Sequence, residues 1–297
     1  GLGTLAAYVL ENKRSVIRRR DDLERMIPLP SLALVPQIRS LNGQGAGRFL
    51  PRWSHNGNGN GHGVAANPAA ELVTFNDARS GGAEAYRTLR TNLLFSAAVG
   101  ALRRLVVTSP GPAEGKSTTA ANLAVAFAQQ GHRVLLIDCD LRRSRLHKMM
   151  EVSQSPGLTN VLVADSSLAE AIKPTQIENL MLMPSGALPP NPAELLGSAR
   201  MRTLLDKLSD SYDTVILDTP PLLAASDAAI ISRMSDGALV VVRAGRTERS
   251  ALESALQQLS TVGARVLGTV LNDPDAEIPK YAKYYSYYYR EYQYSSN

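Results

Sequence analysis

The segment at residues 105–118 constrains the fold of this chain more than any other. An apolar run at 105–108 leads into a loop containing Gly115, Lys116 and Ser117, and a helical pattern follows. In such a strand, loop and helix, backbone N–H groups and the lysine surround phosphate oxygens, and the serine hydroxyl can bind Mg²⁺. The sequence therefore predicts a phosphate-binding P-loop, made by Gly111, Pro112, Ala113, Glu114, Gly115, Lys116, Ser117 and Thr118.

The loop departs from the usual P-loop pattern at one position. Pro110 stands five residues before Gly115, where the first glycine of the motif is usually found. A search for the bare eight-residue pattern would therefore miss this site. The alternative is an ordinary surface turn, which the flanking strand and helix disfavour.

The rest of the chain after residue 79 alternates short apolar runs with amphipathic helical patterns. Such alternation is typical of an α/β fold, a mostly parallel sheet covered by helices on both faces, in which ligands bind at the carboxyl ends of the strands. We expect strands at 105–108, 134–137, 180–183, 215–217, 238–242 and 266–271. We expect helices at 83–98, 117–130, 193–208, 226–234 and 248–261.

Carboxylates follow two of these strands. Asp138 and Asp140 end the strand at 134–137, and Asp218 ends the strand at 215–217. One acidic residue after a strand is often only a solvated loop. Three of them at the phosphate end of one sheet favour a nucleotide site, because Mg²⁺ takes hard oxygen ligands and phosphoryl transfer needs a proton acceptor.

The end of the chain is rich in tyrosine. Its last seventeen residues hold eight of the eleven tyrosines, separated by polar residues. A terminal stretch with this composition cannot bury so many rings, so we expect it to be disordered. Taken alone, it fits equally well a set of modified hydroxyl groups and a sticky aromatic tail used for weak association.

The beginning of the chain has a different character. Residues 1–10 are apolar and lead into a basic stretch at 13–20. Ten residues are too few to span a bilayer, which takes about 20. They fit the cytoplasmic end of a membrane span, and the alternative is an amphipathic helix. Residues 21–36 suggest a short helix, a proline stop and a short strand, and a Gly/Asn-rich tether follows to about residue 76.

Composition adds two limits. The single cysteine, Cys139, excludes an intramolecular disulfide. The net charge of +5 is spread along the chain, so it does not single out nucleic acid as a partner.

Together, the lysine loop, the D-x-D-x-R at Asp138, the Asp218-Thr-Pro-Pro turn and the tyrosine cluster resemble the bacterial tyrosine kinases. The catalytic domain of that family is a modified P-loop ATPase related to the MinD/ParA group. A further match is the family's E-x-x-R-x-x-R motif, at Glu84, Arg87 and Arg90, which the resemblance assigns to subunit contacts in a ring. Without the resemblance, these three residues form an ordinary charged helix face.

The resemblance implies roles for individual residues. Lys116 stabilises the transferred phosphate of ATP, and Ser117, Asp138 and Asp218 organise Mg²⁺. Asp138, or alternatively Asp140, orients or deprotonates the attacking phenol, and Asn272 contacts adenine. The implied phosphate acceptors are Tyr281, Tyr284, Tyr285, Tyr287, Tyr288, Tyr289, Tyr292 and Tyr294.

The same resemblance predicts four regions and their setting. These are a membrane-proximal region at 1–40, a flexible linker at 41–78, a kinase domain at 79–275 and a tyrosine tail at 276–297. The kinase domain would lie on the cytoplasmic face of the inner membrane, in a homo-oligomer. The polysaccharide export machinery and a cognate tyrosine phosphatase are the implied partners, with no nucleic acid.

Two other functions fit the same motifs. A MinD/ParA-type switching ATPase shares the sheet and carboxylates, but it usually carries an extra lysine early in the P-loop, where this chain has Gly111. The second alternative is a nucleotide-bound scaffold of the export machinery. Neither gives a reason for eight terminal tyrosines.

Overall fold

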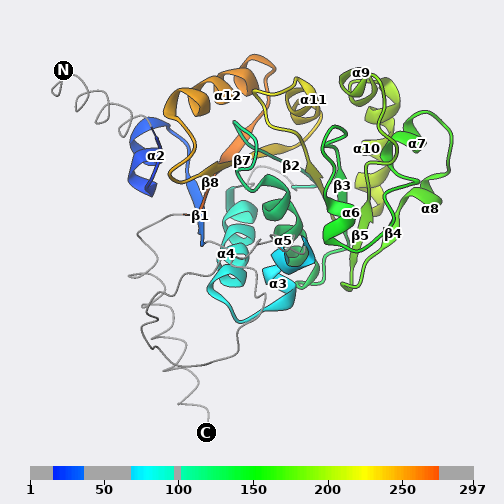
Figure 1. The fold of residues 1–297 in the computed structure, drawn as a ribbon, viewed down its shortest axis with the longest axis horizontal. Coiled ribbons are helices and arrows are strands. Elements are labelled where there is room, and N and C mark those ends of the chain that lie inside the picture. Colours follow the sequence, from blue (N-terminus) through cyan, green and yellow to red (C-terminus); the bar gives the residue numbers. More distant parts are fainter. Residues whose placement is uncertain (1–15, 37–67, 97–101, 274–297) are drawn as a thin grey trace, which may run out of the picture.

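A single eight-stranded sheet organises the chain, in the order β1-β8-β7-β2-β6-β3-β5-β4. The structure is a computed structural model that describes residues 16–36, 68–96 and 102–273. Neighbouring strands are parallel except for β4 and β5 (Figure 1). The strands are β1 (Ser31–Val35), β2 (Arg104–Thr108), β3 (Val134–Asp138), β4 (Lys173–Pro174), β5 (Leu180–Met183), β6 (Thr214–Asp218), β7 (Gly237–Arg243) and β8 (Val266–Asn272).

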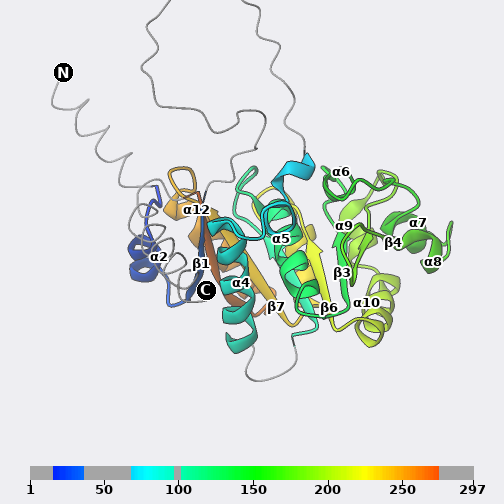
Figure 2. The same ribbon diagram turned by 90° about the horizontal axis from the view of Figure 1, so that it is seen from below.

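Helices cover both faces of the sheet, as Figures 1 and 2 show. One face carries η1 (Pro68–Glu71), α3 (Val73–Asn76), α4 (Gly81–Ser96), α5 (Lys116–Ala128) and α6 (Leu146–Met149). The other carries α2 (Arg20–Met26), α9 (Pro192–Leu196), α10 (Ala199–Ser211), α11 (Asp227–Arg233) and α12 (Arg249–Thr261). Two short helices, α7 (Leu158–Leu162) and α8 (Leu168–Ala171), lie in the long connection between β3 and β5.

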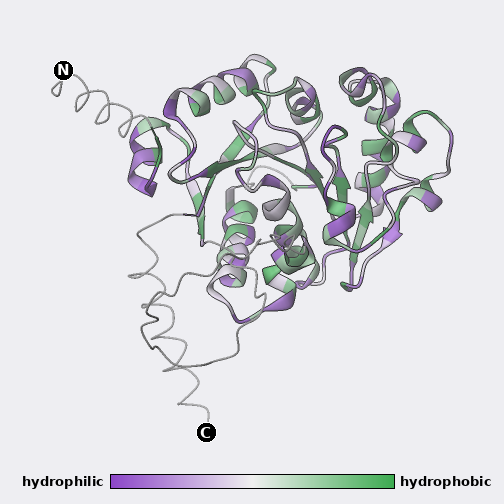
Figure 3. Cartoon of the chain, in the orientation of Figure 1, coloured by the Kyte–Doolittle hydropathy of each residue, from purple (hydrophilic) through white to green (hydrophobic). Residues whose placement is uncertain are grey.

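The central strands form because their residues are apolar on both sides. Every residue of β3 and β6 is buried, and the side chains alternate between two apolar clusters, one under each layer of helices. Figure 3 shows hydrophobic colour along the strands of the sheet and polar colour on the outer sides of the helices. The predicted α/β fold is confirmed, and so are the six predicted strands, each within one residue at either end.

One predicted helix is divided in the structure. The sequence predicted a continuous helix at 193–208, whereas α9 ends before Gly197 and α10 begins after Ser198. The Ser198 hydroxyl accepts a hydrogen bond from the backbone N–H of Met201 at 3.2 Å and so caps α10. A serine cap stabilises a new helix start, and this local effect outweighs the continuous apolar pattern.

The folded unit begins earlier than residue 79. The short helix and strand expected at 21–36 are present as α2 and β1, and β1 joins the sheet beside β8. A Cβ atom at Gly268 would collide with the carbonyl oxygen of Pro30, so this glycine permits the close approach of the two segments. Residues 68–76, within the range expected to be linker, form η1 and α3 and pack on α5.

Three predicted features lie wholly or mostly outside the described residues. These are the apolar residues 1–10, the Gly/Asn-rich part of the linker at 41–67 and the tyrosine tail from residue 276 onward. Within the part of the chain that the structure describes, no helix has the length and apolar character to cross a bilayer.

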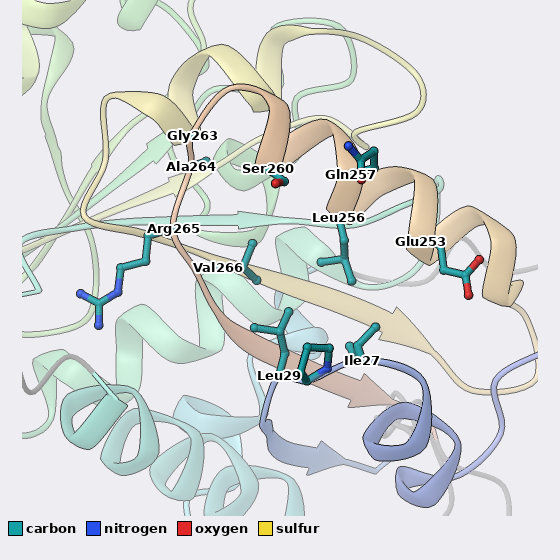
Figure 4. Close-up of a pocket in the computed structure, with 11 residues that line it drawn as sticks. Ile27, Leu29, Glu253, Leu256, Gln257, Ser260, Gly263, Ala264, Arg265 and Val266 are labelled. Atoms are coloured by element: carbon teal, nitrogen blue, oxygen red, sulfur yellow. The ribbon is translucent and has the colours of Figure 1, made fainter.

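A groove of about 710 Å³ lies between α12 and the connection from α2 to β1. Figure 4 shows Ile27, Leu29, Leu256 and Val266 pointing into it, with Glu253 at its margin. Val266 is the first residue of β8, so the groove lies near the amino end of that strand. Phosphate sites of parallel sheets lie at the opposite, carboxyl ends.

Candidate nucleotide and catalytic site

Backbone hydrogen bonds connect the P-loop to the loop that follows β6. The backbone N–H groups of Leu222 and Leu223 donate to the carbonyl oxygens of Ser109 and Pro110, at 2.8 and 3.2 Å. The loop has positive φ at Ala113 (58°) and Gly115 (95°), and Pro110 is not among the residues with positive φ. A glycine is therefore not required at position 110, which explains how this P-loop departs from the usual pattern.

Side chains from the ends of β7 and β8, and from the loop after β7, hold the P-loop at Ala113 and Glu114. The Asn272 amide donates to the Glu114 carbonyl oxygen at 2.9 Å, and Arg243 donates to the Ala113 carbonyl oxygen at 3.1 Å. The Thr247 hydroxyl donates to the Glu114 carboxylate at 2.7 Å. Burial raises the pKa of Glu114 to about 7, despite these contacts. The conformation of the phosphate loop thus depends on β7, β8 and the loop between β7 and α12.

Lys116, the first residue of α5, already contacts the acidic groups of the site. Its ammonium lies 2.8 Å from Asp140 Oδ2 and 3.3 Å from Ser117 Oγ. Burial alone would lower the pKa of Lys116, but the carboxylates of Asp218, Asp140 and Asp138 outweigh it and raise the pKa. The lysine is therefore charged, and a nucleotide phosphate would have to draw it away from Asp140.

Asp138 is buried at the end of β3 beneath the loop that follows. Its carboxylate accepts hydrogen bonds from the backbone N–H groups of Asp140, Arg145 and Leu146, at 3.2, 3.2 and 3.1 Å. Burial, and next the negative charge of Asp218, raise its pKa well above the usual carboxyl range. A carboxylate with a raised pKa can accept a proton near neutral pH, which suits a catalytic base.

Asp218 is paired in register with Asp138 on the neighbouring strand. Both of its carboxylate oxygens are buried and neither makes a hydrogen bond of standard geometry, although the nearby Ser117 hydroxyl interacts with the group and lowers its pKa. Burial raises its pKa, and the charge of Lys116 partly opposes this effect. A buried carboxylate without well-formed hydrogen bonds is costly, and such groups in native proteins usually have a functional reason.

The donor set fits a hard divalent cation bound together with a nucleotide. Within residues 16–36, 68–96 and 102–273, no three His, Cys, Asp or Glu side chains are grouped to hold a metal by themselves. The buried Asp218 carboxylate and the buried Ser117 residue beside it nevertheless offer oxygen ligands next to the P-loop. Mg²⁺ commonly binds through one or two carboxylates plus substrate phosphates and water.

Two further acidic residues hold arginines near the site, and neither was predicted from the sequence. Arg142 makes a two-point contact with buried Asp227, at 2.9 and 3.2 Å. Arg145 donates to Glu71 at 2.7 Å, and the same carboxylate accepts the Thr118 hydroxyl at 2.5 Å. Glu71 and Asp227 carry no motif of their own, and Glu71 lies 47 residues before Thr118, so only the fold brings them to the site.

The predicted subunit-contact residues lie on α4. Arg87 pairs with Glu84 at 2.8 Å, so both remain at the helix surface. Arg90 donates to the carbonyl oxygen of Ala126 at 2.7 Å, near the carboxyl end of α5. Arg90 thus stabilises its own subunit, which the motif alone did not indicate.

The P-loop and two strand-end motifs therefore converge at the carboxyl ends of β2, β3 and β6. Of the predicted site residues, the structure brings Lys116, Ser117, Asp138, Asp140 and Asp218 together, and it sets Asn272 against the P-loop backbone. The tyrosine acceptors lie outside the described residues.

Comparison with known proteins agrees with this geometry. Residues 111–269 match a family model described as an AAA domain. The chain is 41% identical over 213 residues to tyrosine-protein kinase YwqD of Bacillus subtilis, covering 72% of this chain and 89% of that protein. It is 34% identical over 272 residues to tyrosine-protein kinase ptk of Acinetobacter johnsonii, covering 92% of this chain but only 35% of that protein.

A solved structure shows the same fold. The kinase domain of the Escherichia coli tyrosine kinase ETK superposes with a TM-score of 0.72 at 31% identity, covering 84% of this chain and 92% of that one. The P-loop, the paired strand-end carboxylates and these similarities lead to one conclusion: the chain belongs to the bacterial tyrosine-protein kinases, built on the P-loop ATPase fold.

Proposed function

We propose that this tyrosine kinase phosphorylates its own C-terminal tyrosine cluster, between the subunits of a homo-oligomer. The observation that carries the proposal is the cluster of half-buried Lys116 with buried Asp138 and Asp218 at the P-loop of a chain whose last seventeen residues hold eight tyrosines. A switching ATPase or a scaffold would use the same loop, but would leave the tyrosines without a role.

In the proposed reaction the γ-phosphoryl group of ATP passes to a tyrosine hydroxyl. The bond from the β,γ-bridging oxygen to the γ-phosphorus breaks, a bond from the phenol oxygen to phosphorus forms, and ADP leaves. Asp138 takes the phenol proton, and Asp140 is the alternative acceptor. A phenol titrates near 10, so it needs such a base at neutral pH.

Lys116 moves from Asp140 to the β- and γ-phosphate oxygens when ATP binds, and it stabilises charge there. The backbone of residues 111–118 receives the phosphates, and Asn272 supplies an amide next to the P-loop for the adenine. Ser117, Asp138 and Asp218 would hold Mg²⁺, directly or through water, and this cation would neutralise phosphate charge during transfer.

Phosphorylation then changes how the tail interacts. Each phosphotyrosine adds about −1.5 to −2 charges at neutral pH, so a few of them exceed the formal charge of +5. Repulsion between phosphorylated tails would separate the subunits, and dephosphorylation by a phosphatase would allow reassembly. By analogy with the family, we place this cycle at the inner membrane, where it would regulate polysaccharide polymerisation and export.

Mass spectrometry of the C-terminal peptide, after incubation with ATP and Mg²⁺, tests this function. We expect phosphate on several of the residues between Tyr281 and Tyr294. Phosphate release without tyrosine modification would instead indicate a switching ATPase. The absence of both tyrosine modification and phosphate release would indicate a scaffold. Either of these two outcomes would contradict the proposal.

Arg87→Glu is expected to lower the oligomeric mass, because it places like charges on Glu84 and position 87 of the proposed contact face. Light scattering at a fixed protein concentration measures the effect, with circular dichroism as the check on folding. Arg90 is less suitable for this test, since its contact with Ala126 stabilises the subunit itself. An unchanged oligomer in Arg87→Glu would exclude this face as the subunit contact.

A further inference from the structure

Glu71 lies outside every sequence motif, yet it joins the two catalytic loops. It ends η1, and its carboxylate contacts Thr118 of the P-loop helix on one oxygen and Arg145 of the loop after β3 on the other. The first contact measures 2.5 Å and the second 2.7 Å. The segment at 68–76 therefore reaches the catalytic site through one side chain.

The backbone around Glu71 is fixed independently of that carboxylate. The Asn122 amide donates to the Glu71 carbonyl oxygen at 2.8 Å, and it accepts the Thr74 N–H at 2.9 Å. Leu72 is fully buried in the apolar cluster under α4 and α5. A change confined to the Glu71 carboxylate should therefore leave the segment in place.

Arg145 has acidic groups on both sides. Its guanidinium pairs with Glu71, while its backbone N–H donates to Asp138 at 3.2 Å. Its charge also acts on Asp218, whose pKa it lowers. Neither buried oxygen of Asp218 makes a hydrogen bond of standard geometry, and the one hydroxyl that acts on the group, that of Ser117, leaves it able to accept from a guanidinium that loses Glu71.

We propose that Glu71 is a positioning residue that keeps the Arg145 guanidinium away from Asp218, and so leaves that carboxylate to bind the divalent cation of the nucleotide complex. The proposal rests on the proposed role of Asp218 in holding Mg²⁺. The Glu71–Arg145 pair is half-exposed, and pairs of this kind add little to stability. Its value lies in where it holds the positive charge.

The test measures cation binding, with Mn²⁺ as the probe for Mg²⁺ and electron paramagnetic resonance of the ADP complex as the readout. Glu71→Gln keeps the shape of the side chain but removes its charge. We expect it to weaken Mn²⁺ binding about three- to tenfold, because the freed guanidinium competes for Asp218. Glu24→Gln is the matched control, since Glu24 pairs with Arg20 on the remote helix α2.

Arg145→Gln makes the test specific to the proposed route. If Glu71 acts through Arg145, Glu71→Gln should have no further effect once Arg145 is replaced. The double variant should then bind Mn²⁺ with the same affinity as Arg145→Gln alone. Equal Mn²⁺ affinities in wild type and Glu71→Gln would overturn the proposal, and so would a loss that persists without Arg145. Because ADP supports no phosphoryl transfer, these results are readable even if tail phosphorylation fails.

Discussion

Replacing Lys116 with methionine is expected to lower tail phosphorylation by on the order of 10³-fold. The lysine is the charged side chain at the start of α5, and it is placed between the P-loop and the carboxylates at the ends of β3 and β6. Methionine keeps most of the length and removes the charge. Quantitative mass spectrometry of the tail peptide over a time course gives the rate.

Two controls separate this chemical effect from damage to the fold. Lys207→Met makes the same substitution on the exposed side of α10, and it should leave the rate unchanged. Mixing Lys116→Met protein with active enzyme tests transfer between subunits, since the inactive chain should then gain phosphate. Phosphate on isolated Lys116→Met protein, incubated with ATP and no active enzyme, would refute Lys116 as the essential catalytic group.

The fold could be predicted because its signals are local and repeated. Five-residue apolar strands such as β3 and β6 alternate with helices, and the P-loop marks which end of the sheet binds phosphate. The Lys116, Asp138 and Asp218 cluster follows from that alternation, because the carboxyl ends of neighbouring parallel strands share one edge. The sequence did not predict that Asp138 and Asp218 would be direct register partners.

The supporting residues could not be predicted, because their partners are distant in the chain. Thr247 reaches Glu114 across 133 residues, and Arg142 reaches Asp227 across 85. Threonine in a loop and aspartate at a helix start are common for reasons unrelated to any site. Likewise, no composition signal in residues 68–76 shows that Glu71 will contact the P-loop helix.

The sequence of the α4 segment alone also could not settle the role of Arg90. The charged triplet on α4 is compatible with a subunit contact at every position, since helical spacing places all three on one face. Only the packing of α4 on α5 reveals that Arg90 reaches the Ala126 carbonyl oxygen. Arg87 and Glu84 therefore remain the informative positions for the oligomer.

Asp218→Asn is expected to remove most kinase activity and, without nucleotide, to make the protein more stable. The carboxylate is buried without a hydrogen bond of standard geometry, and the Lys116 charge and the Ser117 hydroxyl offset its burial only in part, so its charge costs free energy when no nucleotide is bound. The Asp218 charge also raises the pKa of Asp138, so the substitution removes the repulsion between these two carboxylates. A gain of about 1–2 kcal/mol would raise the unfolding temperature by roughly 3–6 °C.

The gain should depend on pH in a defined direction. Folding raises the pKa of Asp218, so the folded protein binds the carboxyl proton more tightly than the unfolded chain, whose aspartates titrate near 3.9. As the pH rises above that value, wild-type stability falls relative to the asparagine variant, which has no such proton to lose. Differential scanning calorimetry should therefore show a larger difference at pH 8 than at pH 5.5.

Asp138→Asn is the matched comparison, and it should not share the gain. The Asp138 carboxylate accepts three backbone N–H groups, and an asparagine amide nitrogen cannot accept any of them. Addition of ADP and Mg²⁺ should stabilise wild type more than Asp218→Asn, because the cation neutralises the charge that the variant lacks. An Asp218→Asn protein that is less stable than wild type at pH 8 without nucleotide would contradict this account, since it would mean that the buried charge is compensated within the empty site.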